Sequence, residues 1–501
     1  MEKVLLINPA QTYYRNTHRE SAQGSVGLPL GLLYIAAALE KKGCRVQVID
    51  SLVSDSTSIH KHKDCIQYGI PSETLRNKIR EFKPDIVGIS SQYTTQEENV
   101  HETAGIVKDV DDSTLVMVGG ANASCRSRDL LRSAKIDLVV KSEGEAIVGE
   151  IIEYKRGSKN LEDIDGIAYR DGEAIVETVC KRYMKNLDEI PLPSYHLIDL
   201  EDYITLYKRG IYSRDRDVKR NISMITSRGC PYKCVFCSIA QSMGKAWRPH
   251  SAEFVIHHIE ELVKKYDIKH IHFEDDNLLF SHERFFKIID VLEKENLTWD
   301  TPNGIRVDLA LEEDMLRKLS CSGCKSLTIG VESGDEEILK RVVRKGITLG
   351  EVEEFARRCK KAGLPLRAFF ILGFPGETEK TMKNTIAFAI HLLDKYDVEI
   401  INLIATPLFG TELFDICVKN KYFASEINPR TLSESTVSDG NCLIKTDSFT
   451  SEEVEHLSRL FTAKVFRRQF IKGLSRPIKS FKRVGNIYTL KRTVKRLTNF
   501  H

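Results

Sequence analysis

Three cysteines stand within eight positions of this chain of 501 residues, in the stretch SRGCPYKCVFCS. Cys230, Cys234 and Cys237 follow the spacing C-x3-C-x2-C. Structural zinc takes four protein ligands, and no fourth Cys or His stands at a suitable spacing, since His250 comes well after the last cysteine. Three thiolates suit a four-iron cluster with one iron left open for a substrate or cofactor. We therefore expect an iron–sulfur centre, with zinc binding or accidental clustering as the alternatives.

The cysteine stretch resembles the cluster loop of the radical S-adenosylmethionine enzymes, whose motif is C-x3-C-x2-C with an aromatic residue before the last cysteine. Phe236 stands at that position here. The resemblance implies that Cys230, Cys234 and Cys237 bind a 4Fe-4S cluster, whose open iron holds the amino and carboxylate groups of S-adenosylmethionine. An electron from the cluster then cleaves the sulfonium and yields a 5′-deoxyadenosyl radical, while the protein positions and tunes the cofactor.

Acidic residues follow a predicted strand in the stretch HFEDDN. The family places acidic groups here against the methionyl ammonium of S-adenosylmethionine, and an ammonium needs carboxylate or carbonyl partners. The resemblance therefore implies that Glu274 and Asp275 bind this cofactor. Asp276 and Asn277 lie behind them, and these two residues could instead cap the next helix.

Further motifs of the family stand at the ends of later predicted strands. In GVESG the resemblance implies that Glu332 accepts hydrogen bonds from the ribose, and Ser333 either assists it or caps the following helix. In ILGFPGET, Gly373 and Gly376 would let the backbone approach the adenosine part of the cofactor closely. Arg306 of NGIR points either into the barrel or at the methionyl carboxylate.

Short apolar runs alternate with helical patterns over residues 1–150, which predicts a parallel sheet wrapped by helices. Sheets of this kind bind ligands at the carboxyl ends of their strands. Gly119 and Gly120 end one strand, where they either let a ligand approach the backbone or form a tight turn alone. The predicted strands are 4–8, 45–50, 85–90, 115–120 and 136–145, with helices between them that include 28–43 and one from about residue 72.

A predicted hairpin around Asp171 and Gly172, and then the proline-containing stretch DEIPLPSYH, separate this part from a second series of strands and helices. Six βα units predict a partial (β/α)6 TIM-type barrel. Its histidine at 272 and the pair Cys321 and Cys324 are interpreted as ordinary core residues. The predicted strands are 222–226, 270–275, 303–306, 326–333, 367–374 and 399–407.

These patterns predict an α/β protein with a flavodoxin-like (Rossmann-like) parallel sheet domain at its N-terminus. A barrel and a basic helical C-terminal tail follow that domain. The expected boundaries are 1–150 for the N-terminal domain, 151–220 for the hairpin and linker, 221–425 for the barrel and 426–501 for the C-terminal region.

The N-terminal part resembles the cobalamin-binding domain of one subgroup of radical S-adenosylmethionine proteins, through INP, LPLGLLYIAAALEKKG, PDIVGISS, VGG and KSEGEAI. The resemblance implies cobalamin contacts at Gly119 and Gly120. Many such domains supply an axial His to cobalt from D-x-H-x-x-G after the first strand, but this chain has NPAQTYYRN there, and His18 lacks the Asp and the Gly. We therefore expect cobalt without a protein His, with Tyr13, Tyr14 or a water facing it instead.

The resemblance as a whole implies a cobalamin-dependent radical S-adenosylmethionine enzyme that methylates an unactivated carbon. A relative that carries out oxidative cyclisation or ring rearrangement with the same cofactors is the alternative. A non-catalytic cobalamin- or redox-sensing module and a tRNA methylthiotransferase are further alternatives. The last group has an N-terminal domain with its own cysteines, and Cys44, Cys65 and Cys125 show no such framework.

Charge is unevenly spread along the chain. The net charge is +3, yet no acidic residue follows Glu455, and this tail carries thirteen Lys and Arg residues. A basic tail on an acidic body indicates an anionic contact. Its interleaved apolar residues suit a helix that lies in a membrane interface, and a solvated or docked helical end is the alternative. No recognised nucleic-acid module appears, which argues against that class of partner.

No run of 18 or more apolar residues appears, so no membrane span is expected. The N-terminal sequence MEKVLLINPA lacks the features of a secretory signal. We expect a cytoplasmic protein with a possible peripheral membrane contact through its tail. The expected partners are a small-molecule or lipid-like substrate and a flavodoxin- or ferredoxin-type reductant.

Overall fold

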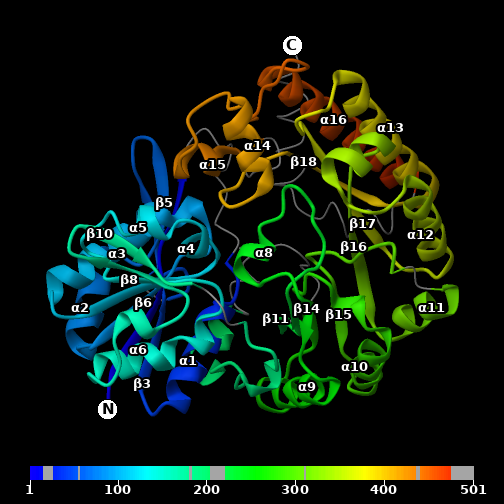
Figure 1. The fold of residues 1–501 in the computed structure, drawn as a ribbon. Helices are drawn as coiled ribbons and strands as arrows, with labels where there is room; N and C mark the ends of the chain where they lie inside the picture. Colours follow the sequence, from blue (N-terminus) through cyan, green and yellow to red (C-terminus); the bar gives the residue numbers. More distant parts are fainter. Residues whose placement is uncertain are drawn as a thin grey trace.

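The computed structural model describes residues 1–14, 26–54, 57–179, 183–203, 220–309, 312–435 and 440–475. The expectations for His18 and for the tail beyond Ser475 lie outside these residues. The N-terminal sheet domain and the barrel stand side by side, with the C-terminal helices against the barrel (Figure 1). No helix among the described residues is long and apolar enough to cross a membrane.

The N-terminal sheet is buried on both faces. Its strand order is β10-β9-β8-β7-β6-β1-β3, and β3, β1, β6, β7 and β8 are parallel. Leu5 and Ile7 of β1 pack with α2 and α3 on one face, whereas Val4 and Leu6 pack with α1 and α6 on the other. An apolar run such as VLLI is what a strand buried on both faces requires. The prediction of a parallel sheet wrapped by helices is therefore confirmed. The bounds are β1 (Lys3–Asn8), α1 (Leu30–Lys41), β3 (Arg45–Asp50), α2 (Ser72–Phe82), β6 (Ile86–Ser90), α3 (Glu97–Val110), β7 (Leu115–Gly119), β8 (Leu138–Val140) and α6 (Val148–Lys155).

The predicted hairpin forms, and it belongs to the N-terminal sheet. Strands β9 (Ile167–Asp171) and β10 (Ala174–Glu177) pair with each other, and β9 pairs antiparallel with β8. The N-terminal sheet thus continues past residue 150 to Glu177. A second sheet, with the order β2-β5-β4, was not predicted. Its bounds are β2 (Gln11–Tyr14), β4 (Ser58–Lys61) and β5 (Cys65–Gly69).

The barrel contains six parallel strands in the order β11-β14-β15-β16-β17-β18. Five of them lie where the sequence predicts a strand. The predicted third strand at 303–306 is wrong, since the strand is β15 at Thr298–Asp300 and Ile305 makes only an isolated bridge to Ile329. Pro302 and Gly304, which has φ +99°, end the extended backbone before that point. The other strands are β11 (Asn221–Met224), β14 (His270–Phe273), β16 (Cys324–Glu332), β17 (Leu366–Leu372) and β18 (Glu399–Ile404).

Helices cover the outside of the barrel, and several begin with a side-chain cap. The Ser251 hydroxyl accepts a hydrogen bond from the Phe254 amide at the start of α9, and Thr348 and Thr378 each form a capping box. The helices between the strands are α9 (Ala252–Tyr266), α10 (His282–Lys294), α11 (Glu313–Cys321), the π-helix Ile338–Val343, α12 (Leu349–Lys361) and α13 (Glu379–Tyr396).

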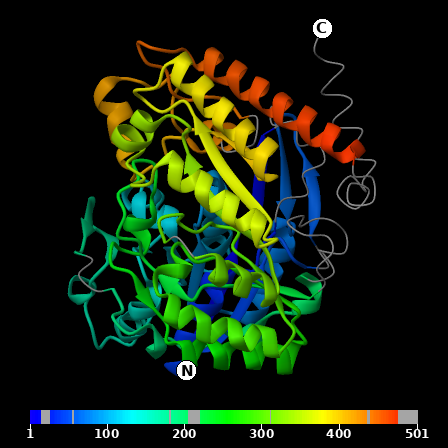
Figure 2. The same ribbon diagram turned by 90° about the vertical axis from the view of Figure 1, so that its right-hand side faces the viewer.

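The basic C-terminal region begins as a helix docked on the barrel. Helix α16 (Ser451–Ser475) runs along the outside of α13 and β18 (Figure 2). Lys472 Nζ lies 2.6 Å from Asp397 Oδ1, and Arg468 Nε lies 2.7 Å from Asp394 Oδ2. Up to Lys472 the tail is therefore a helix docked on the protein, which was the alternative to a helix in a membrane interface. The buried apolar residues of this helix are Val454, Leu457, Phe461 and Val465.

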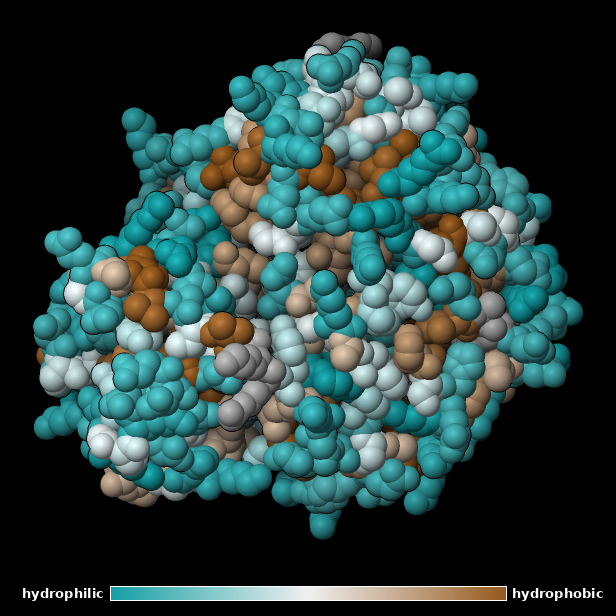
Figure 3. Space-filling view, viewed as in Figure 1, coloured by the Kyte–Doolittle hydropathy of each residue, from teal (hydrophilic) through white to brown (hydrophobic). Residues whose placement is uncertain are grey.

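The surface around these elements is largely hydrophilic. In the face shown in Figure 3, hydrophobic side chains gather only in small separate groups, one of them over α14 (Glu412–Asn420). Val418 of this helix has 53% of its surface exposed. Groups of this size are ordinary on protein surfaces, so we do not assign a partner to them.

Candidate functional site

The three cysteines lie in one tight loop between β12 (Ser227–Arg228) and α8 (Ile239–Ser242). Gly229 has φ +83°, and a Cβ there would lie 2.2 Å from the Ala246 carbonyl oxygen, so only glycine fits before the first cysteine. The Cys237 amide donates to the Cys234 carbonyl at 3.1 Å, which closes a turn between these two ligands. All three thiols are free and half-buried.

The environment of the thiols differs along the loop. Burial raises the pKa of the Cys237 thiol to about 12 and also raises that of Cys234. The three cysteines are not among the groups whose ligand atoms all lie within 4.8 Å of one another. A tetrahedral zinc with Zn–S bonds of about 2.3 Å would bring its sulfurs to within about 3.8 Å. At least two of the three sulfurs therefore stand further apart than the sulfurs of one zinc site.

Glu274 and Asp275 follow β14 but have different surroundings. Half-buried Glu274 accepts a hydrogen bond from Ser223 Oγ at 3.2 Å. Asp275 is 1% exposed, and its carboxylate accepts from the Thr226 amide at 3.0 Å and from Ser227 Oγ at 2.6 Å. These contacts hold the segment that enters the cysteine loop. The contact of either carboxylate with S-adenosylmethionine stays a prediction, and the geometry favours Glu274 for it.

Asp276 and Asn277 form the next part of this turn. Burial, with Asp275 as the smaller cause, raises the pKa of Asp276 to about 7. Asn277 is 2% exposed, and neither its Oδ1 nor its Nδ2 has a hydrogen-bond partner in the described structure. The Asn277 side chain does not cap the short 3-10 helix that follows it. An unpartnered buried amide is costly, so this side chain is available for a polar ligand.

Glu332 ends β16 in a buried ion pair close to the cysteine loop. Its Oε1 accepts from Lys345 Nζ at 2.8 Å, and both side chains are buried. The guanidinium of Arg306 lies 3.4 Å from the centre of the Tyr232 ring, which belongs to the cysteine loop. Arg306 also donates to the Lys345 carbonyl oxygen at 2.8 Å and pairs with Asp308. The structure thus brings Glu332 and Arg306 together beside the cysteines.

The other residues predicted to contact the cofactor lie on neighbouring turns. The hydroxyl of fully buried Ser333 accepts from the Asp335 amide at 3.2 Å, so it caps the following segment. Gly373 and Gly376 have φ +93° and +102°, as the sequence of this turn suggests. Glu377, which was not predicted, accepts from the Gly373 amide at 2.8 Å, and burial raises its pKa to about 7.

The carboxyl edge of the N-terminal sheet faces the cysteine loop. Gly119 ends β7, and Gly120, with φ +121°, begins α4 (Ala121–Cys125). A Cβ on Gly120 would lie 2.6 Å from the Ser91 carbonyl oxygen. The missing side chain therefore lets the backbone of Gly120 approach Ser91. Contact of this turn with cobalamin stays a prediction. The side chain of Asn122 is satisfied within the same edge by Ser91, Thr94 and Glu97.

Helix α4 packs directly on α8, which follows the three cysteines (Figure 1). The Arg126 guanidinium, held by Glu97, lies 4.0 Å from the centre of the Phe409 ring. Gln241 of α8 donates to the Gly410 carbonyl oxygen at 3.1 Å. The predicted cobalamin edge and the predicted cluster loop are therefore neighbours in space, although more than a hundred residues separate them in the chain.

A buried ionic group joins the two domains at the base of the cysteine loop. Glu143 accepts from Arg228 at 3.3 Å and from Arg248 at 2.8 Å, and its side chain is fully buried. Arg228 also lies 2.7 Å from Glu145. The sequence analysis did not assign these residues. Their signal was present, since Glu143 and Glu145 lie in KSEGEAI and Arg228 immediately precedes Gly229 and the first cysteine.

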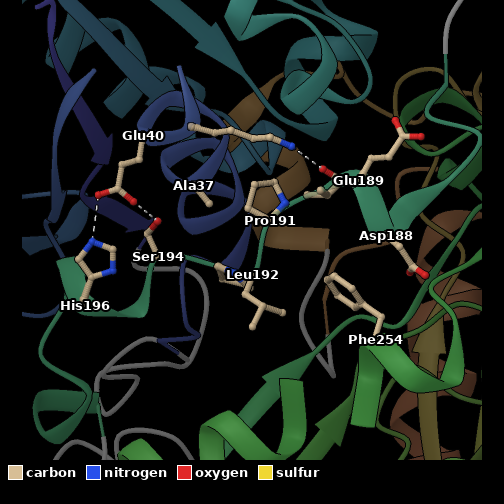
Figure 4. A pocket seen from close by; sticks show the side chains of 12 residues that line it. Ala37, Glu40, Asp188, Glu189, Pro191, Leu192, Ser194, His196 and Phe254 are labelled. Atoms are coloured by element: carbon tan, nitrogen blue, oxygen red, sulfur yellow. Dashed lines mark hydrogen bonds and ion pairs between the residues drawn. The ribbon is translucent and has the colours of Figure 1, made fainter. Parts of the chain in front are cut away.

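A cavity of about 520 Å³ lies away from this site, between α1, the linker and α9 (Figure 4). At its edge Glu40 accepts from Ser194 Oγ and lies 2.9 Å from His196 Nε2. None of the predicted site residues lines it. The lining residues are Ala37, Glu40, Lys41, Asp188, Glu189, Ile190, Pro191, Leu192, Pro193, Ser194, His196 and Phe254.

Comparison with known proteins agrees with this arrangement. Residues 224–389 match the radical SAM superfamily, and residues 22–152 match the B12 binding domain. An uncharacterized methyltransferase of Pyrococcus horikoshii is 30% identical over 461 residues, which cover 92% of this chain and 91% of that protein. This chain belongs to the radical SAM superfamily and carries a B12-binding domain.

Other relatives of this B12-binding radical SAM protein extend the comparison. Cytidylyl-2-hydroxyethylphosphonate methyltransferase of Streptomyces wedmorensis is 27% identical over 457 residues, covering 85% of this chain and 83% of that one. The solved cobalamin-dependent S-adenosylmethionine radical enzyme OxsB has a TM-score of 0.70 at 19% identity and covers 99% of this chain and 70% of its own. The radical S-adenosylmethionine methyltransferase TsrM from Kitasatospora setae has a TM-score of 0.62 at 18% identity, covering 83% of this chain and 78% of its own. These two structures share its fold.

The family implies a 4Fe-4S cluster, S-adenosylmethionine and cobalamin, and the residues present fit all three. Three free thiols from one loop would provide the ligands of a cluster that keeps an open iron. Beside them, Glu332 and the unpartnered amide of Asn277 offer polar contacts for S-adenosylmethionine. The carboxyl edge of the N-terminal sheet, where such folds bind ligands, faces this loop. No described His follows β1 at the place of an axial ligand.

Proposed function

We propose that this B12-binding radical SAM protein transfers a methyl group to an unactivated carbon of a small molecule. The packing of α4 of the B12-binding domain on α8 behind the cluster cysteines carries this proposal. When bound, the cluster would supply the electron that cleaves S-adenosylmethionine, and cobalamin would supply the methyl group. A substrate held between the two domains would meet both.

The residues of the chain have separate tasks in this proposal. Cys230, Cys234 and Cys237 hold the cluster. Glu274 binds the methionyl ammonium, and Glu332 accepts from the ribose while its ion pair with Lys345 holds the carboxylate in place. Gly373 and Gly376, with Glu377 holding the Gly373 amide, form the turn against the adenine side. Gly119 and Gly120 shape the edge that receives cobalamin.

The printed names of the relatives support methyl transfer over cyclisation. The two relatives described above are both named methyltransferases, and they match the chain over most of its length. The anaerobic magnesium-protoporphyrin IX monomethyl ester cyclase of Cereibacter sphaeroides is 26% identical and is covered over 56% of its length. Cyclisation is therefore the second candidate, and the two reactions leave different products of S-adenosylmethionine.

The test uses the full chain reconstituted anaerobically with iron, sulfide and cobalamin, then reduced and given S-adenosylmethionine with a deuterated methyl group. A methyltransferase of this kind should form labelled methylcobalamin and S-adenosylhomocysteine in equal amounts, measured by mass spectrometry. Omission of cobalamin should abolish both products. If 5′-deoxyadenosine were the sole product and cobalamin stayed unlabelled, the methyl-transfer proposal would be wrong and the cyclase alternative would stand.

Two finer points about partners belong to the same proposal. A flavodoxin- or ferredoxin-type protein would supply electrons to the cluster, because the chemistry needs a low-potential donor. The part of the basic tail beyond the docked helix α16 would contact an anionic membrane surface, and the exposed Phe470 and Ile471 near the end of that helix suit such a contact.

A further inference from the structure

A second group of potential metal ligands lies inside the barrel. His270 and His272 of β14 and Asp300 of β15 each offer one ligand atom, and these three atoms all lie within 4.8 Å of one another. The three residues are at most 5% exposed. His272 Nδ1 lies 2.7 Å from Asp300 Oδ1, His270 Nε2 lies 3.3 Å from His272 Nδ1, and His270 Nε2 lies 3.7 Å from Asp300 Oδ1.

Strand alternation places this group on the inner face of the barrel. Phe273 of β14 and Trp299 of β15 pack edge-to-face with Phe285 of the outer helix α10, with ring centres 6.0 and 5.4 Å away. Phe273 and Trp299 thus point outward. Because neighbouring residues of a strand point to opposite faces, His270 and His272 of β14 and Asp300 of β15 point inward. Two histidines and an aspartate from adjacent strands therefore meet in the barrel interior.

Thr298 Oγ1 lies 2.7 Å from His270 Nδ1, on the side of the ring away from His272, and it also lies 3.2 Å from the Lys269 carbonyl oxygen. If Nδ1 carries the proton of the neutral ring, it donates to Thr298 Oγ1, and the Nε2 lone pair faces His272 and Asp300. Metal-bound histidines are commonly oriented in this way, with the other ring nitrogen donating to an oxygen.

The three ligand atoms converge on one point from two adjacent strands. A cation at the centre would be bound by all three atoms at once. Two ligands of a tetrahedral ion with bonds of about 2.0–2.1 Å lie about 3.3–3.4 Å apart, and the three observed separations bracket that value.

We propose that His270, His272 and Asp300 bind a divalent transition-metal ion that is distinct from the cluster. Two imidazoles and one carboxylate suit zinc and iron(II). Glu274 directly follows β14, two residues beyond His272 and about 7 Å further along the extended chain at about 3.3 Å per residue. The ion thus lies below the predicted S-adenosylmethionine site and links β14 to β15, where it holds Glu274 at its place.

The test measures zinc in the full-length protein reconstituted with cluster and cobalamin, because zinc is distinguished from iron and cobalt by elemental analysis. After removal of loose metal, one zinc per chain should bind from added zinc chloride. X-ray absorption at the zinc edge should show nitrogen and oxygen neighbours at about 2.0–2.1 Å and no sulfur at about 2.3 Å. The variant Cys230→Ala/Cys234→Ala/Cys237→Ala should lose iron and keep this zinc.

Asp300→Asn and His272→Gln should each weaken zinc binding at least 100-fold, whereas His258→Gln should not change it. His258 is also buried but hydrogen-bonds to Tyr195 in a different part of the barrel. Circular dichroism should show that the parent, His258→Gln, Asp300→Asn and His272→Gln are all folded. Of these four proteins, only the parent and His258→Gln should show a rise of Tm with zinc, so the two measurements separate loss of the site from loss of the fold. Sulfur neighbours in the spectrum of the parent protein, less than half an equivalent of zinc, or equal binding by folded Asp300→Asn would overturn the proposal.

Discussion

Glu332 adopts a backbone conformation that is uncommon for a residue with a side chain. Its φ is +72°, at an irregular point in the pairing of β16 with β17. A Cβ on the nearby Gly330 would lie 2.3 Å from Glu332 Oε1 and 2.7 Å from Lys345 Nζ, so Gly330 makes room for the ion pair. A strained backbone of this kind costs about 1–3 kcal/mol and is typical of functional sites. The strain directs the carboxylate towards the cysteine loop.

Replacement of Glu332 tests its contact with S-adenosylmethionine. A charged hydrogen bond is worth about 1.5–3 kcal/mol, so Glu332→Gln should weaken binding of S-adenosylmethionine by about 10- to 100-fold. Iron content should not change, because the cysteines remain. Equilibrium dialysis of the reconstituted protein measures the affinity, and Glu337→Gln, an exposed residue on the next segment, serves as the control. Unaltered affinity would remove Glu332 from the site.

Cys230, Cys234 and Cys237 are the predicted cluster ligands, and their loss should have the largest effect. Cys230→Ala/Cys234→Ala/Cys237→Ala should abolish the brown absorbance and bring iron from about four per chain to near zero, because no other described cysteine lies in this loop. Colorimetric iron analysis after anaerobic reconstitution provides the measurement. The exposed Cys321 is the matched control, and Cys321→Ala should keep all the iron. Full iron retention in the triple variant would contradict the cluster assignment.

At the scale of elements, the turn from β7 into α4 packs closely against the loop after β6. Gly120→Ala would place a Cβ 2.6 Å from the Ser91 carbonyl oxygen at a φ of +121°. We expect this change to lower the free energy of unfolding by at least about 1–3 kcal/mol and to reduce cobalamin binding.

Gly105 in the middle of α3 gives the matched glycine control, because a Cβ there meets nothing within 4 Å. Gly105→Ala should raise the free energy of unfolding by up to about 1 kcal/mol through helix propensity. Urea titration followed by circular dichroism compares the two variants, and cobalamin retention on a desalting column provides the functional readout. Equal stability of the two variants would show that the β7–α4 turn is not strained as described.

At the scale of the whole molecule, the ionic group of Glu143, Glu145, Arg228 and Arg248 couples the two domains. Glu143→Gln would leave two buried guanidiniums without their shared carboxylate. Removal of one partner of a buried ion pair costs about 3–5 kcal/mol, so the free energy of unfolding should fall by about that amount. Thermal unfolding in a calorimeter should also separate into two transitions as the domains uncouple.

Glu354→Gln removes an exposed carboxylate that pairs with Arg357 and Arg358 on α12, and it should leave the unfolding profile nearly unchanged. A Glu143→Gln protein that unfolds like this control, in one transition at the parent temperature, would show that the buried group does not couple the domains.

The basic tail beyond α16 gives a prediction that concerns the whole protein and its surroundings. A chain that ends after Ser475 keeps the docked helix and its contacts to Asp394 and Asp397 but loses the last eight Lys and Arg residues. The full chain should sediment with anionic vesicles at low salt and be released at high salt, since each basic residue adds about 1 kcal/mol near such a surface. Equal sedimentation of the shortened chain would rule the tail out as the anchor.

Local patterns were sufficient to predict most elements, and the assignment of the cluster ligands stays a prediction from a pattern of the same kind. The C-x3-C-x2-C spacing, the run VLLI of β1 and the glycines of ILGFPGET each carry their information within a few residues. Helix and strand periods are also local properties, so the parallel sheet and five of the six barrel strands could be placed from the sequence. The third barrel strand was missed because its run, Thr298–Asp300, is only three residues long.

Tertiary structure alone decided which distant residues meet. Asp275 turns to Thr226 and Ser227, Glu143 reaches Arg248 across 105 positions, and His272 meets Asp300 across a strand pair. These contacts depend on how the sheets close and on strand register, and neither leaves a periodic signal in the sequence. The sequence by itself determined the two parallel sheets and contains the cysteine spacing that predicts the cluster, because spacing and periodicity are local, whereas partners across strands and domains exist only once the chain has folded.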